Sequence, residues 1–366
     1  MFKVLILAGT RPEVIKQAPV YKALQDYASV AAIFCTSGQH DVLAEQALMA
    51  FGIMPECRVT LQREAGSDLS DLTSELVFSL SRMLDKQQPD LVVVHGDTTT
   101  ALCGALAAFY KHIPVAHVEA GLRTARFENP FPEEMNRRLI AQMAKLHFAP
   151  TNRALANLKS EGLDQQYMYC TGNTIVDALH NFILPTPVHK IQFFNTTSQH
   201  LLVTCHRRES WQHIRTLCGI VTNIVDANSN VQCVWVTHPN PVVSDPVFTH
   251  FKHHPQVRTL PPMLYTDFVH LMANSDVILT DSGGIIEEAS VLGKALVIMR
   301  EVTERPEALE LPNVALVGYD FDKLFQQVQT WLAHPVNGTS SNVFGDGMAG
   351  KRIAQCIVNF LGGNRL

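Results

Sequence analysis

The sequence predicts an α/β protein with two doubly wound parallel sheets and a cleft between them. Three observations lead to this fold class. The chain has 366 residues, the length of two ordinary domains. Short apolar runs alternate with helical segments in the first half, and the alternation restarts in the second half. A stretch with prolines and polar residues, 182–199, separates the two halves.

The predicted strands of the first half are apolar, as expected for central parallel strands. They cover residues 3–8, 30–36, 90–95, 115–118 and 146–149. Helices are predicted for 12–27, 39–51 and 69–87, and Pro12 suits the first turn of a helix. Repeated strand–helix–strand units indicate a Rossmann-like sheet.

The second half repeats this pattern. Its predicted strands cover 201–205, 231–236, 276–280 and 295–299. We expect an N-terminal Rossmann-like domain over 1–172 and a C-terminal one over 173–349, with a last helix at about 350–366 that packs back on the first domain. In such sheets ligands bind at the carboxyl ends of the strands.

Composition excludes several classes of protein. A hydrophobic content of 46% with 17% charged residues supports a packed core and excludes disorder. The net charge of −5 shows no basic surplus, which argues against a large nucleic-acid footprint. No apolar run has the length expected of a signal peptide or a membrane span. The eight cysteines are scattered without a CxxC pair, and Cys35, Cys205 and Cys233 lie in or beside predicted strands. We therefore expect reduced core cysteines, a cytoplasmic location, and neither nucleic-acid nor membrane partners.

The stretch LTDSGGIIEEA, 279–289, is the centre of the functional prediction. A strand is followed by a Ser-Gly-Gly turn, and Glu287 and Glu288 begin a helix. Glycines at a helix start let backbone N–H groups approach an anion, most often a phosphate. Glu288, one turn into the helix, suits a ribose diol. The alternative is an ordinary helix cap.

The turn after the first predicted strand, LAGTRPEVIK, lacks GxGxxG, and no dinucleotide fingerprint occurs elsewhere. Arg11 and Lys16 leave this turn near the carboxyl end of the strand. Arg11 could clamp a phosphate with two hydrogen bonds, or it could be an ordinary surface arginine.

Three carboxylates are predicted at one edge of the first sheet. Asp97 follows the strand that ends at His95, Glu119 ends the next strand, and Glu133 begins the helix after Pro132. Asp97 alone could be a helix cap, and Glu133 an acid favoured by the helix dipole. Together the three indicate acid–base catalysis.

In the second half, polar residues follow successive strands of one sheet and should therefore converge. They are His206, His238, Ser282 and Arg305. Paired His-x-carboxylate sequences, HGD and HVE, leave a metal hydrolase open as an alternative.

The motifs GTRPEVIK, HGDTTTA, HVEAGLR, PFPEEMNR, TGNTIVDAL, HRRES, HPNP, LTDSGGIIEEA and TERPEA follow one another between Gly9 and Ala308. In this order they resemble the bacterial, non-hydrolysing UDP-N-acetylglucosamine 2-epimerases, and FGDGMA (344–349) fits as well. The resemblance implies the GT-B fold, with the C-terminal domain binding UDP. It also implies reversible interconversion of UDP-GlcNAc and UDP-ManNAc for surface polysaccharide synthesis, without a cofactor or metal.

The resemblance also implies roles for individual residues. UDP would be held by Arg11, His206, His238, Phe268, Ser282, Gly283, Gly284, Glu288 and Arg305. Asp97, Glu119 and Glu133 would be the acid–base groups, with His206 also among the catalytic candidates and Lys16 supporting the site. Asp41 and Gly66 replace arginines that relatives use at an activating UDP-GlcNAc site, which predicts weak or altered activation. We expect a homodimer.

The predicted mechanism is elimination of UDP and re-addition through 2-acetamidoglucal. Four alternatives remain: an epimerase of a related UDP-2-acetamido sugar, a GT-B glycosyltransferase, a metal hydrolase, and a noncatalytic sugar-nucleotide sensor.

Overall fold

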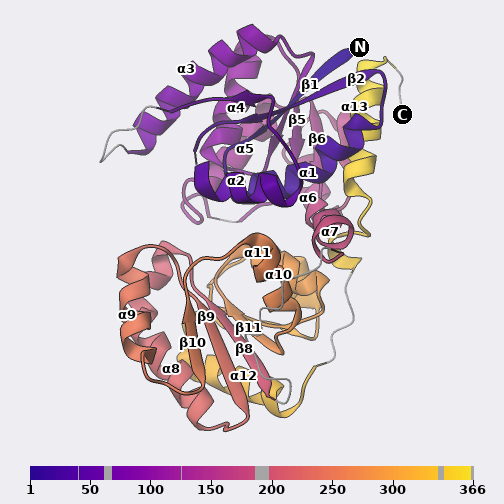
Figure 1. The fold of residues 1–366 in the computed structure, drawn as a ribbon. Helices are drawn as coiled ribbons and strands as arrows, with labels where there is room; N and C mark the ends of the chain where they lie inside the picture. The colour runs from indigo at the N-terminus through magenta and orange to yellow at the C-terminus, as the bar shows by residue number, and fades with distance from the viewer. Residues whose placement is uncertain (40, 62–67, 125, 186–197, 337–341, 364–366) are drawn as a thin grey trace. The chain divides into compact units, whose positions relative to one another are not determined.

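A computed structural model of the chain describes residues 1–39, 41–61, 68–124, 126–185, 198–336 and 342–363 (Figure 1). The chain divides into two compact units. Unit 1 comprises Met1–Phe182 and Phe344–Leu366, and unit 2 comprises Ile183–Val343. Each unit holds one sheet of parallel strands with helices on both faces, so the prediction of two Rossmann-like domains is confirmed.

The sheet of unit 1 has seven strands in the order β3-β2-β1-β4-β5-β6-β7. They are β1 (Phe2–Ala8), β2 (Val30–Thr36), β3 (Cys57–Arg58), β4 (Leu91–His95), β5 (Val115–Val118), β6 (Leu146–Ala149) and β7 (Met168–Cys170). The strand order reverses between β1 and β4, which lie side by side. Ligands of doubly wound sheets bind at this switch point, beyond the carboxyl ends of the strands.

The helices of unit 1 cover both faces of its sheet. They are α1 (Arg11–Gln25), α2 (Asp41–Ala50), α3 (Leu69–Gln87), α4 (Thr99–Tyr110), α5 (Glu133–Met143), α6 (Asn152–Ser160), α7 (Thr174–Ala178) and α13 (Ala349–Leu361). Leu5, Leu7 and Val94 pack on one face against α3 and α4. Alternation along the strand turns Val4 and Ile6 to the opposite face, and α1 contacts β1, β2 and β4.

Unit 2 repeats the arrangement with six strands in the order β10-β9-β8-β11-β12-β13. They are β8 (Gln199–Thr204), β9 (Val231–Val236), β10 (Val257–Leu260), β11 (Val277–Thr280), β12 (Ala295–Ile298) and β13 (Val314–Leu316). Its longer helices are α8 (Ile214–Asp226), α9 (Pro241–Phe251), α10 (Tyr265–Ala273), α11 (Gly283–Val291) and α12 (Phe321–Ala333). The fully buried Trp235 lies in the core under α8, α9 and α12. The switch point lies between β8 and β11.

The predicted strands match the observed ones to within two residues at each end, but β3, β7, β10 and β13 were not predicted. These four strands are short and lie at or near sheet edges, where fewer residues are buried on both faces and the apolar signal is weak. The predicted start of α11 was also wrong. The helix begins at Gly283, because Ser282 takes the extended backbone of an N-cap and both glycines enter the helix.

The units divide after Phe182 rather than after Gly172, and the predicted linker lies largely outside the described residues. Asp177 of α7 explains the later division. Its carboxylate accepts hydrogen bonds from the N–H groups of Ala349 and Gly350 at 3.1 and 2.8 Å, which ties α7 to the start of α13. Figure 1 shows α13, in yellow, lying beside α1, and the two helices are in contact.

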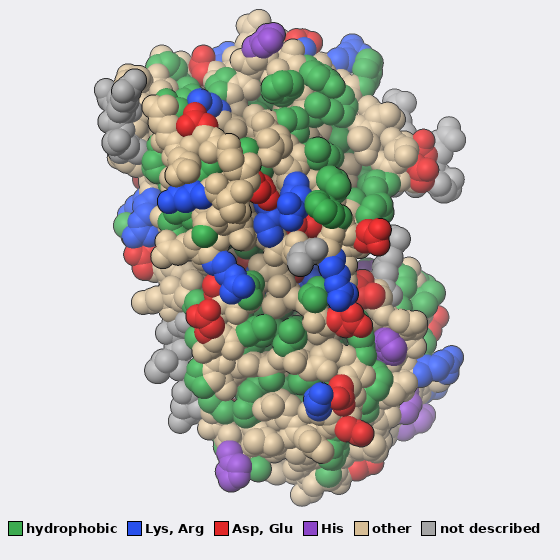
Figure 2. Space-filling model, turned by 180° about the vertical axis from the view of Figure 1, so that it is seen from behind, with side chains coloured by type: hydrophobic (Ala, Val, Ile, Leu, Met, Phe, Trp, Pro, Cys, Tyr) green, Lys and Arg blue, Asp and Glu red, His purple; other side chains and the backbone are tan. Residues whose placement is uncertain are grey.

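Two features of the structure concern the expectation of neither nucleic-acid nor membrane partners: the distribution of charge on the surface and the length of the helices. On the face that Figure 2 shows, basic and acidic side chains lie close to one another. Within the described ranges, every helix is too short or too polar to cross a membrane.

Candidate active site

Glu13 joins the two turns that flank the switch point of unit 1. Its carboxylate accepts a hydrogen bond of 3.0 Å from the N–H of Gly9, in the turn after β1. It also accepts one of 2.7 Å from the hydroxyl of Thr98, in the turn after β4. Glu13 is only 1% exposed, and this burial raises its pKa to about 7. Nothing in the sequence marks this residue as functional, because an acid in the first turn of a helix is ordinary.

The turn after β1 also packs closely against the start of α4. The hydroxyls of Ser37 and Thr100 lie 2.7 Å apart, directly beside Gly9. A Cβ atom at Gly9 would lie 2.1 Å from the Thr100 hydroxyl oxygen, so any other residue would push these turns apart. Thr98, rather than Asp97, caps α4, since its hydroxyl accepts a hydrogen bond from the N–H of Ala101.

Glu119 lies at the end of β5 and is surrounded by polar groups. It forms an ion pair with Lys16 of α1, and both side chains are buried. The amide of Asn173 donates a hydrogen bond of 3.2 Å to the same carboxylate oxygen, and His95 Nε2 lies 3.8 Å from the other. Glu119 also has a φ of +63°, in the left-handed region that a residue with a side chain seldom adopts. Such strained positions cluster at functional sites, where surrounding contacts hold them.

His117 supports the backbone next to this carboxylate. Burial lowers its pKa to about 3, so the ring is neutral at physiological pH. The neutral ring lies 2.7 Å from the carbonyl oxygen of Gly96 through Nε2, which therefore donates. The turn between β4 and α4 is held by this bond from the neighbouring strand.

Asp97 is held by α5. Its carboxylate forms an ion pair with the buried Arg137, and its carbonyl accepts a hydrogen bond of 2.9 Å from the amide of Asn136. Glu133 opens α5 one turn before these two residues and is half-buried. The fully buried Glu134 binds Arg137 at 3.1 Å and the N–H of Thr124 at 3.0 Å, so it has a structural role. Asp97 and the start of α5 therefore lie together, as expected.

Asp281 organises the corresponding edge of unit 2. Its fully buried carboxylate accepts hydrogen bonds from the N–H groups of His206 and Arg207 at 2.8 and 2.9 Å, across the switch point. The Cys205 thiol donates a third hydrogen bond at 3.3 Å. Local sequence does not reveal this role, because the bonds join residues that are 74, 75 and 76 positions apart. Asp281 fixes the turn after β8 against the start of α11.

His206 and His238 lie together, as predicted. Their ring centroids are 5.9 Å apart, and the ring centroids of Trp211 and His238 are 5.4 Å apart. Desolvation lowers the pKa of His238, so its neutral form is favoured. Its Nδ1 accepts a hydrogen bond of 3.1 Å from the N–H of Asn240. His206 Nε2 is hydrogen-bonded to the hydroxyl of Thr204.

Arg305 lies beside the start of α11, where an anion was predicted to bind. Its guanidinium pairs with the buried carboxylates of Glu287 and Glu304, and the residue is 7% exposed. A Cβ atom at Gly283 would lie 2.7 Å from Arg305 Nη1, so glycine allows this close packing. An anion at the helix start would therefore meet a guanidinium that two carboxylates already orient.

Glu288 of α11 is buried in unit 2 and is held by a residue of α10. The hydroxyl of Tyr265 donates a hydrogen bond of 2.7 Å to the Glu288 carboxylate, and both residues are buried. Phe268, expected from the resemblance to help hold UDP, is also buried, one turn further along α10. Arg11 begins α1 in unit 1 and is half-buried.

Comparison with known proteins now identifies the family. Residues 22–358 match the family model described as UDP-N-acetylglucosamine 2-epimerase. The UDP-N-acetylglucosamine 2-epimerase of Salmonella typhimurium is 40% identical over 373 residues, which cover 98% of this chain and 99% of that protein. The chain belongs to the UDP-N-acetylglucosamine 2-epimerase family. The predicted resemblance is confirmed.

Two further members of the epimerase family show the extent of the likeness. A probable UDP-N-acetylglucosamine 2-epimerase of Ralstonia solanacearum is 41% identical over 371 residues, covering 98% of this chain and 99% of that protein. The crystal structure of the UDP-GlcNAc 2-epimerase from Neisseria meningitidis, bound to UDP-GlcNAc, has a TM-score of 0.93 at 35% identity. That match covers 98% of this chain and 100% of the other.

Two other predictions concern metal binding and activation in this member of the epimerase family. Groups of three or more His, Cys, Asp or Glu side chains that could hold a metal are absent from the described part of the chain. Gly66 and the side chain of Asp41, on which the expected change in activation rests, lie outside the described residues. The activation therefore stays a prediction.

Proposed function

We propose that this epimerase interconverts UDP-GlcNAc and UDP-ManNAc by eliminating UDP and adding it back. Unit 1 would supply the acid–base groups for the sugar, and unit 2 would hold UDP. The observation that carries the proposal is Glu119, a buried carboxylate held in a strained backbone by Lys16 and Asn173 beside the switch point. A catalytic carboxylate needs this kind of fixed position.

The chemistry explains why the leaving group departs before or with the proton. The C2 hydrogen of the sugar is not beside a carbonyl, so a carboxylate alone cannot remove it easily. Breaking the C1–O bond sends its electron pair to UDP and builds positive charge at C1, which acidifies C2. A carboxylate of unit 1 then takes the C2 proton, and the C2–H electrons form the C1=C2 bond of 2-acetamidoglucal.

Re-addition completes the epimerisation. A proton reaches C2 from the opposite face while the phosphate oxygen of UDP returns to C1. Asp97, Glu119 and Glu133 are our candidates for these two proton transfers, and His206 is a fourth candidate. Departing UDP carries negative charge, which Arg11, Arg305 and the backbone of Ser282, Gly283 and Gly284 at the start of α11 would stabilise. Tyr265 would orient Glu288 toward the ribose, with His238 and Phe268 completing the UDP site.

Proton NMR of UDP-GlcNAc incubated with the full chain in deuterated water tests the proposal. We expect UDP-ManNAc to form without an acceptor and deuterium to enter C2 of both epimers. Epimerisation with the C2 hydrogen fully retained would overturn the elimination mechanism. Transfer of the sugar to an acceptor, without epimerisation, would support the glycosyltransferase alternative. Parallel reactions with other UDP-2-acetamido sugars would define the preferred substrate.

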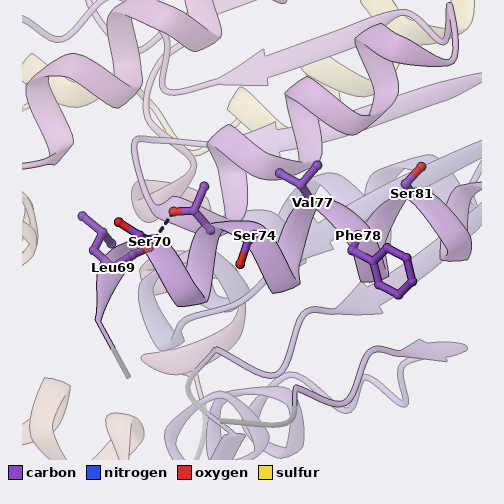
Figure 3. A pocket seen from close by; sticks show the side chains of 7 residues that line it. Leu69, Ser70, Ser74, Val77, Phe78 and Ser81 are labelled. Atoms are coloured by element: carbon purple, nitrogen blue, oxygen red, sulfur yellow. Dashed lines mark hydrogen bonds between the residues drawn. The ribbon is translucent and has the colours of Figure 1, made fainter. Parts of the chain in front are cut away.

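We also propose a homodimer, with α3 as the contact surface. One side of α3 carries a shallow pocket lined by Leu69, Ser70, Thr73, Ser74, Val77, Phe78 and Ser81 (Figure 3). Phe78 is 63% exposed there, and its ring is covered only by the Arg82 guanidinium, 5.5 Å from the ring centroid, among the contacts of the described residues. Light scattering should give the mass of two chains for the parent protein and of one chain for Phe78→Asp. A dimeric Phe78→Asp variant would rule out this surface, and Phe127→Asp, at another exposed phenylalanine, is the matched control.

We also propose that the protein is located in the cytoplasm. All eight cysteines are free thiols, which suits the reducing cytoplasm.

A further inference from the structure

Two cysteines lie opposite each other at the edge of the sheet of unit 1. Cys35 of β2 and Cys57 of β3 are register partners in adjacent parallel strands. Cys35 is a buried member of the hydrophobic core that α3 covers, and Cys57 is partly buried against the same core, so their side chains point to the same face of the sheet. Adjacent strands are ~4.8 Å apart, and disulfides join Cα atoms ~4.4–6.8 Å apart. The backbone therefore already has the spacing of a disulfide.

The two thiols differ in exposure and acidity. Cys35 is fully buried, and Cys57 is half-exposed at the sheet edge. A hydrogen bond from the Cys35 thiol lowers the pKa of Cys57 to about 7, and the positive charge of Lys86 on α3 also lowers it. The hydrogen bond and burial raise the pKa of Cys35. A thiol with a pKa near the ambient pH is the best attacking group in thiol–disulfide exchange.

We propose that Cys35 and Cys57 form a reversible disulfide on contact with a small-molecule disulfide such as oxidised glutathione. The Cys57 thiolate attacks one sulfur of the disulfide, giving a mixed disulfide and one glutathione thiolate. Cys35 attacks the Cys57 sulfur and passes its proton to the second glutathione sulfur, which leaves as a thiol. Two electrons pass from the protein thiols to the disulfide, and the first released thiolate takes up a proton according to the pH.

The disulfide would close the segment between β2 and β3, which contains α2. This segment begins at the turn that contacts α4, where the Ser37 and Thr100 hydroxyls meet. The Thr36 carbonyl accepts the N–H of Val59 at 2.8 Å, so the strands stay paired beyond the cysteines. Closing such a loop restricts the unfolded chain and should stabilise the folded one.

Treatment of the full-length reduced protein with oxidised glutathione near neutral pH tests the proposal. We expect an intact mass lower by two hydrogen atoms, and a peptide linked through Cys35 and Cys57 in a non-reducing digest. The melting temperature should rise by a few degrees and return after dithiothreitol. Cys57→Ser should abolish the linked peptide and the rise. Cys170→Ser, which removes an exposed thiol outside the pair, should retain both.

Three results would overturn the proposal. The first is a glutathione adduct that persists on Cys57 while Cys35 stays a free thiol. The second is a linked peptide that joins a different pair of cysteines. The third is an unchanged mass after prolonged treatment at a large excess of oxidised glutathione. If Cys57→Ser does not fold, Cys57→Ala keeps the test available, because alanine removes the sulfur without placing a hydroxyl against the core.

Discussion

Lys16 of α1 and Glu119 at the end of β5 form a buried ion pair, although 103 positions separate them in the sequence. The pair connects the helix that follows β1 to a strand two places away in the sheet. It fixes the carboxylate for which we propose a role in proton transfer.

Removing one partner of the pair should lower the free energy of unfolding more than removing both partners. Lys16→Met leaves a buried carboxylate without its cation and should lower the free energy of unfolding by about 3–5 kcal/mol. Glu119→Gln leaves a buried ammonium group in the same way. The double variant should recover part of the loss, because neither charge remains, and urea unfolding of all four proteins measures the coupling. Additive losses would show that the two groups do not interact across this contact.

Different substitutions should affect proton transfer and UDP binding separately. Glu119→Gln and Asp97→Asn keep the side-chain shape and remove the titrating oxygen, so turnover should fall ~10²–10⁴-fold while UDP binding changes little. Glu288→Ala should instead weaken UDP binding by about 1.5–3 kcal/mol, the contribution of a hydrogen bond to a charged group. Calorimetry beside turnover measures both, with circular dichroism as the check on folding. Normal turnover by Asp97→Asn and Glu119→Gln would move the active site elsewhere.

Tyr265→Phe should reduce UDP affinity several-fold, because Glu288 loses the hydroxyl that orients it. Turnover at saturating substrate should change less than affinity. Tyr319→Phe is the matched control. Its hydroxyl lies 2.8 Å from Ser210 Oγ in the same unit and does not contact Glu288. Equal effects of the two substitutions on UDP binding would argue against the proposed orientation of Glu288.

Glu13 should make stability depend on pH near neutrality. Its folded pKa of about 7 lies above its ordinary value of 4.5, so the folded state binds the proton more tightly. This stabilisation is complete below about pH 4.5 and is lost as the pH rises through about 7. Relative to Glu13→Gln, the parent protein should gain about 2–3 kcal/mol between about pH 8 and about pH 5. Urea unfolding of both proteins across this range measures the difference.

Glu161→Gln provides a control of opposite sign for this pH dependence. Hydrogen bonds from Arg123 lower the pKa of Glu161, so its contribution is lost only as the pH falls through that lowered value. Between about pH 8 and about pH 5, the difference between this variant and the parent should stay constant. A parallel pH response of Glu13→Gln and the parent protein would show that Glu13 does not titrate in this range.

The sequence by itself determined the fold class, most of the strands and the family. Central strands bury both faces, so their apolar runs are continuous and easy to recognise, as at Val115–Val118. The turn motifs that follow these strands identify the family and place the candidate residues at strand ends. Short edge strands such as β3 and β13 bury less, and their local sequence carries little signal.

Only the tertiary structure decided which partners hold the candidate residues. Lys16 with Glu119, Arg137 with Asp97 and Tyr265 with Glu288 are pairs from different elements, and Asp281 binds the backbone of a strand end that precedes it by 75 positions. The same is true of Glu13, whose raised pKa comes from burial between two turns. Local sequence determines backbone preferences and burial patterns. Contacts across a sheet depend on strand order and register, which arise only when the whole chain packs.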